Sequence, residues 1–192
     1  TALYTYAYLD NDIPSIVKRA LGAIPQECNY ASIIKDLLLW YEEDSIDWRR
    51  AWQKLEDKYN HDLCPWAKSD PPTIQDKIVG KFNIQGHFNG AYIILGLLYG
   101  KGDYLESIKI CTRCGQDTDS NVANCGGVMG VIIGYDALPQ TVKDELDSYM
   151  DRDYNFTSLS INSASDLSYE LALENILQND GQIDGDIIKL KT

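Results

Sequence analysis

Residues 122–134 limit the possible folds of this chain more than any other stretch. They are almost all small or apolar, and glycines recur among them at spacings of three and four, at Gly126, Gly127, Gly130 and Gly134. A glycine inside a helix costs about 1 kcal/mol relative to alanine. Several glycines on one stripe therefore need a compensating reason, and close backbone approach to another helix supplies one. The segment predicts a central, buried helix.

The rest of the chain also has helical periodicity. Apolar spacing and start signals predict helices over residues 14–21, 88–99, 104–111 and 139–150, and others after Asn29, after Asp47 and from Ser165 or Asp166. Asn11 and Asp12 are the start signal of the helix over 14–21, and Asp103 is that of the helix over 104–111. In the helix after Asp47, the aromatic residues Trp48, Trp52 and Tyr59 are interpreted as core residues. Prolines and weak periodicity predict a long connection between Asn60 and Gly86. No segment has the alternating pattern of a half-buried strand, so the predicted fold class is all-α.

Composition excludes several classes of protein. The 192 residues are 44% hydrophobic, which indicates a globular chain rather than a disordered one. A net charge of −12 argues against binding to a nucleic-acid backbone, and no apolar run is long enough to span a membrane. Five cysteines without framework spacing fit a reducing compartment, so a cytoplasmic location is expected.

An acidic stretch precedes the glycine-rich helix and has two possible roles. Asp117 and Asp119 can converge if Asp117 lies in the loop and Asp119 or Ser120 is the N-cap. Their oxygens would suit a hard cation such as Mg²⁺. The same residue types are also ordinary helix caps, and spacing alone leaves both roles open. An EF-hand is excluded, because Val122 and Val128 stand where that loop requires Gly and Glu.

Three other features carry weaker functional signals. Cys111 and Cys114 form a CxxC motif, but without a preceding strand they are best interpreted as buried apolar residues. His87 stands in a loop that opens a helix, where it is either structural or functional. The acidic tail 179–186 resembles a calcium loop, but Lys191 occupies the closing position, which favours a plain turn.

Several segments together resemble the ADP-ribosylglycohydrolase family, which includes the dinitrogenase reductase-activating glycohydrolases. They are GQDTDSN at residues 115–121, GGVMG at 126–130, YDALP at 135–139, NGAY at 89–92, GLLYGKGDY at 96–104 and the helical region 12–59. The resemblance extends to about Leu177.

This resemblance implies an orthogonal multi-helix bundle that hydrolyses ADP-ribosyl N- or O-glycosidic linkages with two Mg²⁺ ions. By motif, Asp117, Asp119 and Ser120 are expected metal ligands, and Gly115 and Gln116 are expected near the ribose. His87 and Asn89 are expected in the substrate pocket, whereas no general acid or base is indicated. The expected partner is an ADP-ribosylated protein or a small ADP-ribose conjugate. The alternative is a non-catalytic module of the same fold that binds ADP-ribose or a nucleotide.

The sequence also departs from the family pattern. A Gly-Asp-Ala-Leu-Gly segment and a Thr-Asp-Asp motif, which supply the other metal ligands in family members, are not found in it. We therefore expect residues 1–192 to be the C-terminal portion of one domain, and expect this portion to be inactive without the missing N-terminal part.

Overall fold

The computed structural model describes residues 1–60, 85–185 and 187–190. Within them the chain is helical apart from one small hairpin, which confirms the predicted all-α class. Most of the connection predicted between Asn60 and Gly86 lies outside the described residues. The chain divides into two compact units, Thr1–Pro139 and Gln140–Thr192. The helices of the first unit are α1 (Ala2–Ala7), α2 (Ile13–Leu21), α3 (Asn29–Glu43), α4 (Trp48–Tyr59), α6 (Gly86–Gly100), α7 (Tyr104–Cys114), α8 (Thr118–Ile133) and the 3₁₀ turn η1 (Tyr135–Ala137).

Aspartate caps start three of the helices, as the sequence predicts. The side chains of Asp12, Asp47 and Asp103 each accept a hydrogen bond from a backbone N–H in the first turn of α2, α4 and α7, respectively. Such a bond satisfies one of the N–H groups that a helix start leaves without a partner. α3 begins one residue earlier than predicted, because Cys28 holds the cap position and Asn29, the predicted cap, is already helical.

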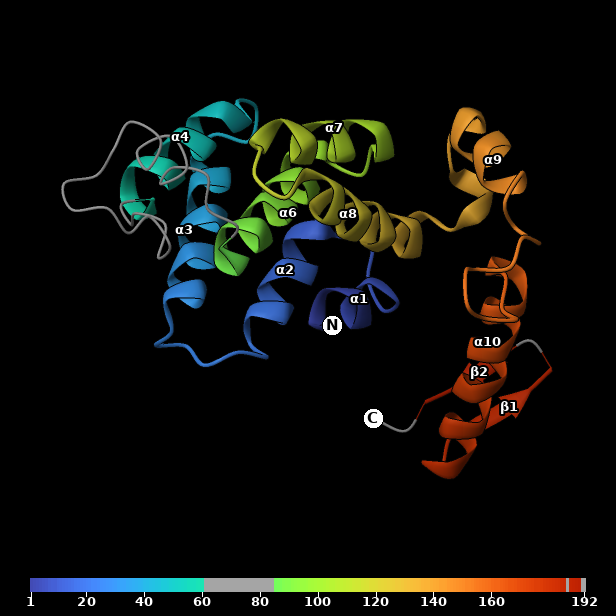
Figure 1. Cartoon of the computed structure of the whole chain (residues 1–192). Helices are drawn as coiled ribbons and strands as arrows, with labels where there is room; N and C mark the ends of the chain where they lie inside the picture. Colours follow the sequence, from blue (N-terminus) through green and yellow to red (C-terminus); the bar gives the residue numbers. More distant parts are fainter. Residues whose placement is uncertain (61–84, 186, 191–192) are drawn as a thin grey trace. The chain divides into compact units, whose positions relative to one another are not determined.

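Helix α6 is the centre of the first unit. All its residues from Phe88 to Gly100 are buried except Gly90 and Ile93, which are partly buried, and it contacts α2, α3, α4, α7 and α8 (Figure 1). The prediction that the glycine-rich helix is the central one is therefore wrong. α8 lies against α6, and only part of its surface is buried. Two of its glycines make room for aromatic side chains instead of a helix backbone, since Gly127 faces Tyr4 and Gly126 faces Tyr104.

Close backbone approach does occur, but between α6 and α7. A Cβ atom added at Gly96 would lie 2.8 Å from the carbonyl oxygen of Ser107 and 2.9 Å from the Cβ of Cys111. At Gly100 an added Cβ would lie 2.7 Å from the Cα of Ser107. Glycine is thus needed at these positions of α6. In the sequence, the apolar residues around Gly96 and Gly100 predict the helix but do not indicate the close approach to α7.

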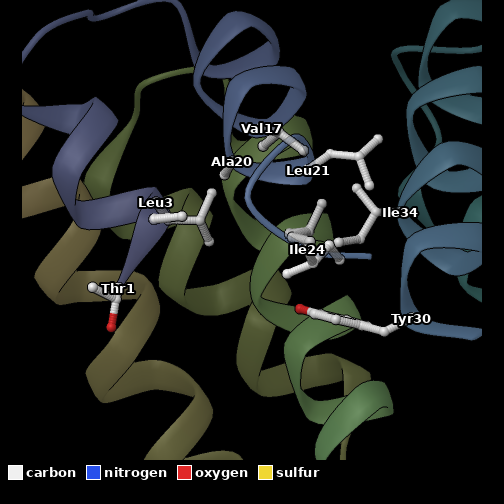
Figure 2. A pocket seen from close by; sticks show the side chains of 10 residues that line it. Thr1, Leu3, Val17, Ala20, Leu21, Ile24, Tyr30 and Ile34 are labelled. Atoms are coloured by element: carbon white, nitrogen blue, oxygen red, sulfur yellow. The ribbon is translucent and has the colours of Figure 1, made fainter. Parts of the chain in front are cut away.

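An apolar pocket of about 170 Å³ opens beside the N-terminal helices. Figure 2 shows Leu3 of α1, Leu21 of α2 and Ile34 of α3 around it. Tyr30 lies at its edge, where burial raises the pKa of the hydroxyl to about 12. The pocket walls include none of the residues that the sequence indicates for function.

The second unit holds α9 (Gln140–Asp147), α10 (Ile161–Gln178) and an antiparallel hairpin of β1 (Gln182–Asp184) and β2 (Ile187–Lys189). The predicted start of the last helix is wrong: Ser160, not Ser165 or Asp166, caps α10 through a reciprocal pair of bonds with Ser163. The hairpin was not predicted, because its strands are only three residues long. None of the described helices is long and apolar enough to cross a membrane.

Alanine substitutions at two glycines test the packing of α6. Gly96→Ala should lower the free energy of unfolding by about 1–3 kcal/mol, because the new methyl group collides with the α7 backbone. Gly130→Ala, where an added Cβ meets nothing within 4 Å, should raise it by up to about 1 kcal/mol through helix propensity. Urea denaturation measures both, and equal effects of the two variants would refute this packing.

Candidate metal and ribose site

A strained turn leads from α7 into α8. Gly115 has φ 92° and Gln116 has φ 57°, so two successive residues lie in the left-handed region. Glycine adopts this conformation without a steric penalty, whereas glutamine does so only at a cost of about 1 kcal/mol. The turn is closed by a 2.9 Å hydrogen bond from the Thr118 N–H to the Gln116 carbonyl. It places Asp117 at the N-cap of α8.

Asp117 does not use its side chain as a cap. It occupies the N-cap position, yet its carboxylate makes no hydrogen bond to the backbone of the first turn, unlike Asp12, Asp47 and Asp103. The capping role that the sequence left open therefore does not account for this carboxylate. The expectation that Asp119 or Ser120 would be the N-cap is wrong, since both already lie inside α8.

The two carboxyl groups of the motif lie side by side. A hydrogen bond with the Asp117 side chain, and then one from the Ser120 backbone N–H, lower the pKa of the Asp119 carboxyl. Two ionised carboxylates within hydrogen-bonding distance repel each other, so the pair is stable when it shares a proton or a cation. Asp119 and Ser120 are exposed, whereas Asp117 is half-buried.

One buried hydrogen bond joins the first turns of α6 and α8. The Asn121 side-chain N–H₂ donates to Oδ1 of Asn89 over 3.0 Å, and both residues are buried. This bond explains why an amide stands at each position. It also brings the first turn of α6, with half-buried His87, to the start of α8. The contact of His87 and Asn89 with a substrate stays a prediction.

A second connection reaches the turn from α4. The Tyr92 hydroxyl donates to Oε1 of Glu56 over 2.5 Å, and Nε2 of Gln116 donates to the Tyr92 oxygen over 3.2 Å. Burial, and then the bond to Glu56, raise the pKa of the Tyr92 hydroxyl, so it keeps its proton at neutral pH. On the same face of α4, the Trp52 indole N–H donates to the Cys114 carbonyl over 3.1 Å.

Sequence reasoning missed these α4 residues. Trp52 was assigned to the core, and Glu56 was not singled out. Their signal was an acidic residue on the same helical face as the apolar stripe of Trp52, Leu55 and Tyr59. A lone carboxylate on such a face needs a polar partner from elsewhere in the fold.

The cysteines of the CxxC motif are buried free thiols, in agreement with their interpretation as apolar residues. Cys111, Cys114 and Cys125 pack in the core, and Cys28 is half-buried. Burial, and then the neighbouring Cys111, raise the pKa of the Cys114 thiol well above its usual range. A buried neutral thiol is a poor nucleophile. A zinc site at the CxxC motif would need two more ligands from Cys64, Cys125, His61 or His87, and of these Cys64 and His61 lie outside the described residues.

The oxygen ligands at the start of α8 are of the type that a hard cation prefers, but they are too few to fill its coordination shell. Asp117, Asp119 and Ser120 offer the oxygen ligands that Mg²⁺ prefers. In the part of the chain that the structure describes, three or more His, Cys, Asp or Glu side chains do not come together as a metal cluster. These residues could therefore hold one side of an ion, with water or other groups on the other side.

A family model described as ADP-ribosylglycohydrolase matches residues 1–172. The match includes the turn, both carboxylates and the helices that hold them, and it covers most of the chain. The chain belongs to the ADP-ribosylglycohydrolase family. Neither a curated protein nor a solved structure matches it.

The bond between Asn121 and Asn89 can be tested by its stability. Asn121→Ala should lower the free energy of unfolding by about 1–3 kcal/mol, because it leaves the buried Asn89 oxygen without a donor. Asn124→Ala, on the exposed side of α8, should change it by less than about 0.5 kcal/mol. Combining Asn89→Ala with Asn121→Ala should cost less than the sum of the single changes. Strict additivity would show that the two amides do not interact.

Proposed function

We propose that this protein hydrolyses ADP-ribosyl N- or O-glycosidic linkages in a Mg²⁺-dependent reaction, and that Asp117, Asp119 and Ser120 supply part of the metal shell. The observation that carries this proposal is the position of Asp117. A carboxylate at a helix N-cap that leaves the cap unmade, and lies beside a second carboxylate, is arranged for an external cation rather than for its own helix. Membership of the family adds the reaction class.

The residues of the turn have separate roles in this proposal. Asp117 and Asp119 provide the negative charge, and their position on a helix anchored to buried α6 keeps them fixed. Gly115 brings the backbone close to the sugar without a side chain, and Gln116 hydrogen-bonds to the ribose. Bound Mg²⁺ would supply electrostatic stabilisation to the ribose oxygens and to an attacking water.

The remaining ligands would come from outside the described residues. Two carboxylates and one hydroxyl fill only part of the octahedral shell of Mg²⁺, which binds proteins through few carboxylates and several waters. We propose that a further segment of the same protein, carrying the Thr-Asp-Asp motif of the family, completes a site for two ions. The substrate would be an ADP-ribosylated protein side chain or a small ADP-ribose conjugate.

Charge-removing substitutions in the full-length gene product test the metal assignment. Asp117→Asn and Asp119→Asn should each slow Mg²⁺-dependent release of ADP-ribose from ADP-ribosyl-arginine, or from a serine or acetyl-ester conjugate, by at least about 100-fold. Asp103→Asn is the matched control, because asparagine caps a helix as well as aspartate does. It should leave the rate unchanged.

Two results would contradict the proposal in different ways. Full activity in the Asp117→Asn and Asp119→Asn variants would refute the metal assignment. Tight binding of ADP-ribose by the unmodified protein, without turnover of any of these conjugates, would instead support a non-catalytic binding module of the same fold.

A further inference from the structure

We propose that Glu56 and Tyr92 are positioning residues that fix the direction of the Gln116 side-chain amide, so that its carbonyl oxygen faces the ligand as a hydrogen-bond acceptor. This inference rests on the proposed function, because it assigns Gln116 to the ribose. It adds two residues, Glu56 of α4 and Tyr92 of α6, to which the sequence analysis assigns no role.

The direction follows from counting donors and acceptors along the chain of bonds. A carboxylate can only accept, so the single proton of the Tyr92 hydroxyl goes to Oε1 of Glu56. The Tyr92 oxygen can then only accept from Gln116. Gln116 must therefore present its N–H₂ group, which lies 3.2 Å away, and turn Oε1 in the opposite direction.

The carboxylate at the start of this chain of bonds is itself held on both oxygens. Oε1 of Glu56 accepts from Tyr92, and Oε2 accepts from the Asn60 side chain over 2.6 Å. Trp52, one turn before Glu56 on α4, binds the Cys114 carbonyl immediately before the turn. Helix α4 therefore holds the backbone at Cys114, directly before the turn, through Trp52. It also holds the Gln116 side chain within the turn, through Glu56 and Tyr92.

The side-chain oxygen of Gln116 lies at the far end of this chain of hydrogen bonds and lacks a donor among the described residues. Its Oε1 atom is buried and accepts no hydrogen bond from the described part of the chain. A buried acceptor without a donor costs about 1–3 kcal/mol, and Gln116 adds backbone strain through its positive φ. A ligand with a hydroxyl donor satisfies this oxygen. The ribose hydroxyls of ADP-ribose are donors of that kind.

Four variants of the full-length product test this inference. Tyr92→Phe removes the acceptor for the Gln116 N–H₂ group, and Glu56→Gln allows Tyr92 to donate to Gln116 and turn its amide around. Each should weaken the binding of ADP-ribose about tenfold in calorimetry. Tyr99→Phe and Asp57→Asn are the controls. Among the described residues, the buried Tyr99 hydroxyl makes no hydrogen bond, and the Asp57 side chain accepts one only from Gln53. Both should bind ADP-ribose normally.

Two further measurements separate positioning from general damage to the fold. ADP, which lacks the distal ribose, should bind equally to all variants, whereas an equal loss for ADP and ADP-ribose would overturn the inference. In the ligand-free protein, the NMR resonances of the Gln116 side-chain N–H₂ should shift in Tyr92→Phe and Glu56→Gln but not in the controls. Unshifted resonances would also overturn it.

Failure of the proposed function looks different. If the unmodified protein binds and hydrolyses ADP-ribosyl substrates while Tyr92→Phe behaves like Tyr99→Phe, only the positioning role is wrong. If the unmodified protein binds no ADP-ribose at all, the proposed function and the ligand contact of Gln116 are both wrong, whatever the resonances of its amide.

Discussion

The buried bond between Asn89 and Asn121 is the interaction on which the candidate site depends most. It links the first turn of α6, which the rest of the unit surrounds, to the first turn of α8, which carries the acidic motif. Because α6 is enclosed by five helices, its first turn is a fixed point. Because the bond ties the first turn of α8 to α6, it also holds Asp117 and Asp119 in place. Without it, α8 would be held mainly by apolar contacts, which are not directional.

Two residues of the turn before α8, Gln116 and Asp117, have arrangements that reduce the stability of the fold. Asp117 leaves its helix uncapped, at a cost of about 1 kcal/mol relative to a made cap, and Gln116 has a strained backbone and a buried oxygen without a partner. Such costs cluster where a structure is arranged for a ligand. Asp12, Asp47 and Asp103 each cap a helix, so among the aspartates at the N-cap positions of the described helices Asp117 alone makes no cap.

Local signals in the sequence predicted local structure well. Asp12, Asp47 and Asp103 each marked a helix start, because a cap needs only the few residues that follow it. Ser160 was missed because its partner in the capping box is Ser163 rather than the usual Glu or Gln. The central helix was misassigned, since glycine spacing on α8 does not reveal whether a ring or a backbone fills the space. Glu56, Tyr92 and Gln116 are 36 and 24 residues apart in sequence, and only tertiary packing brings them together.

The position of a bound ion tests the central claim most directly. A crystal structure of the full-length product with Mn²⁺ in place of Mg²⁺ would locate the metal by its anomalous signal. Our account predicts a peak at coordination distance, about 2 Å, from carboxylate oxygens of both Asp117 and Asp119. A metal bound elsewhere, with the Asp117 carboxylate accepting from the backbone N–H groups of α8, would contradict it.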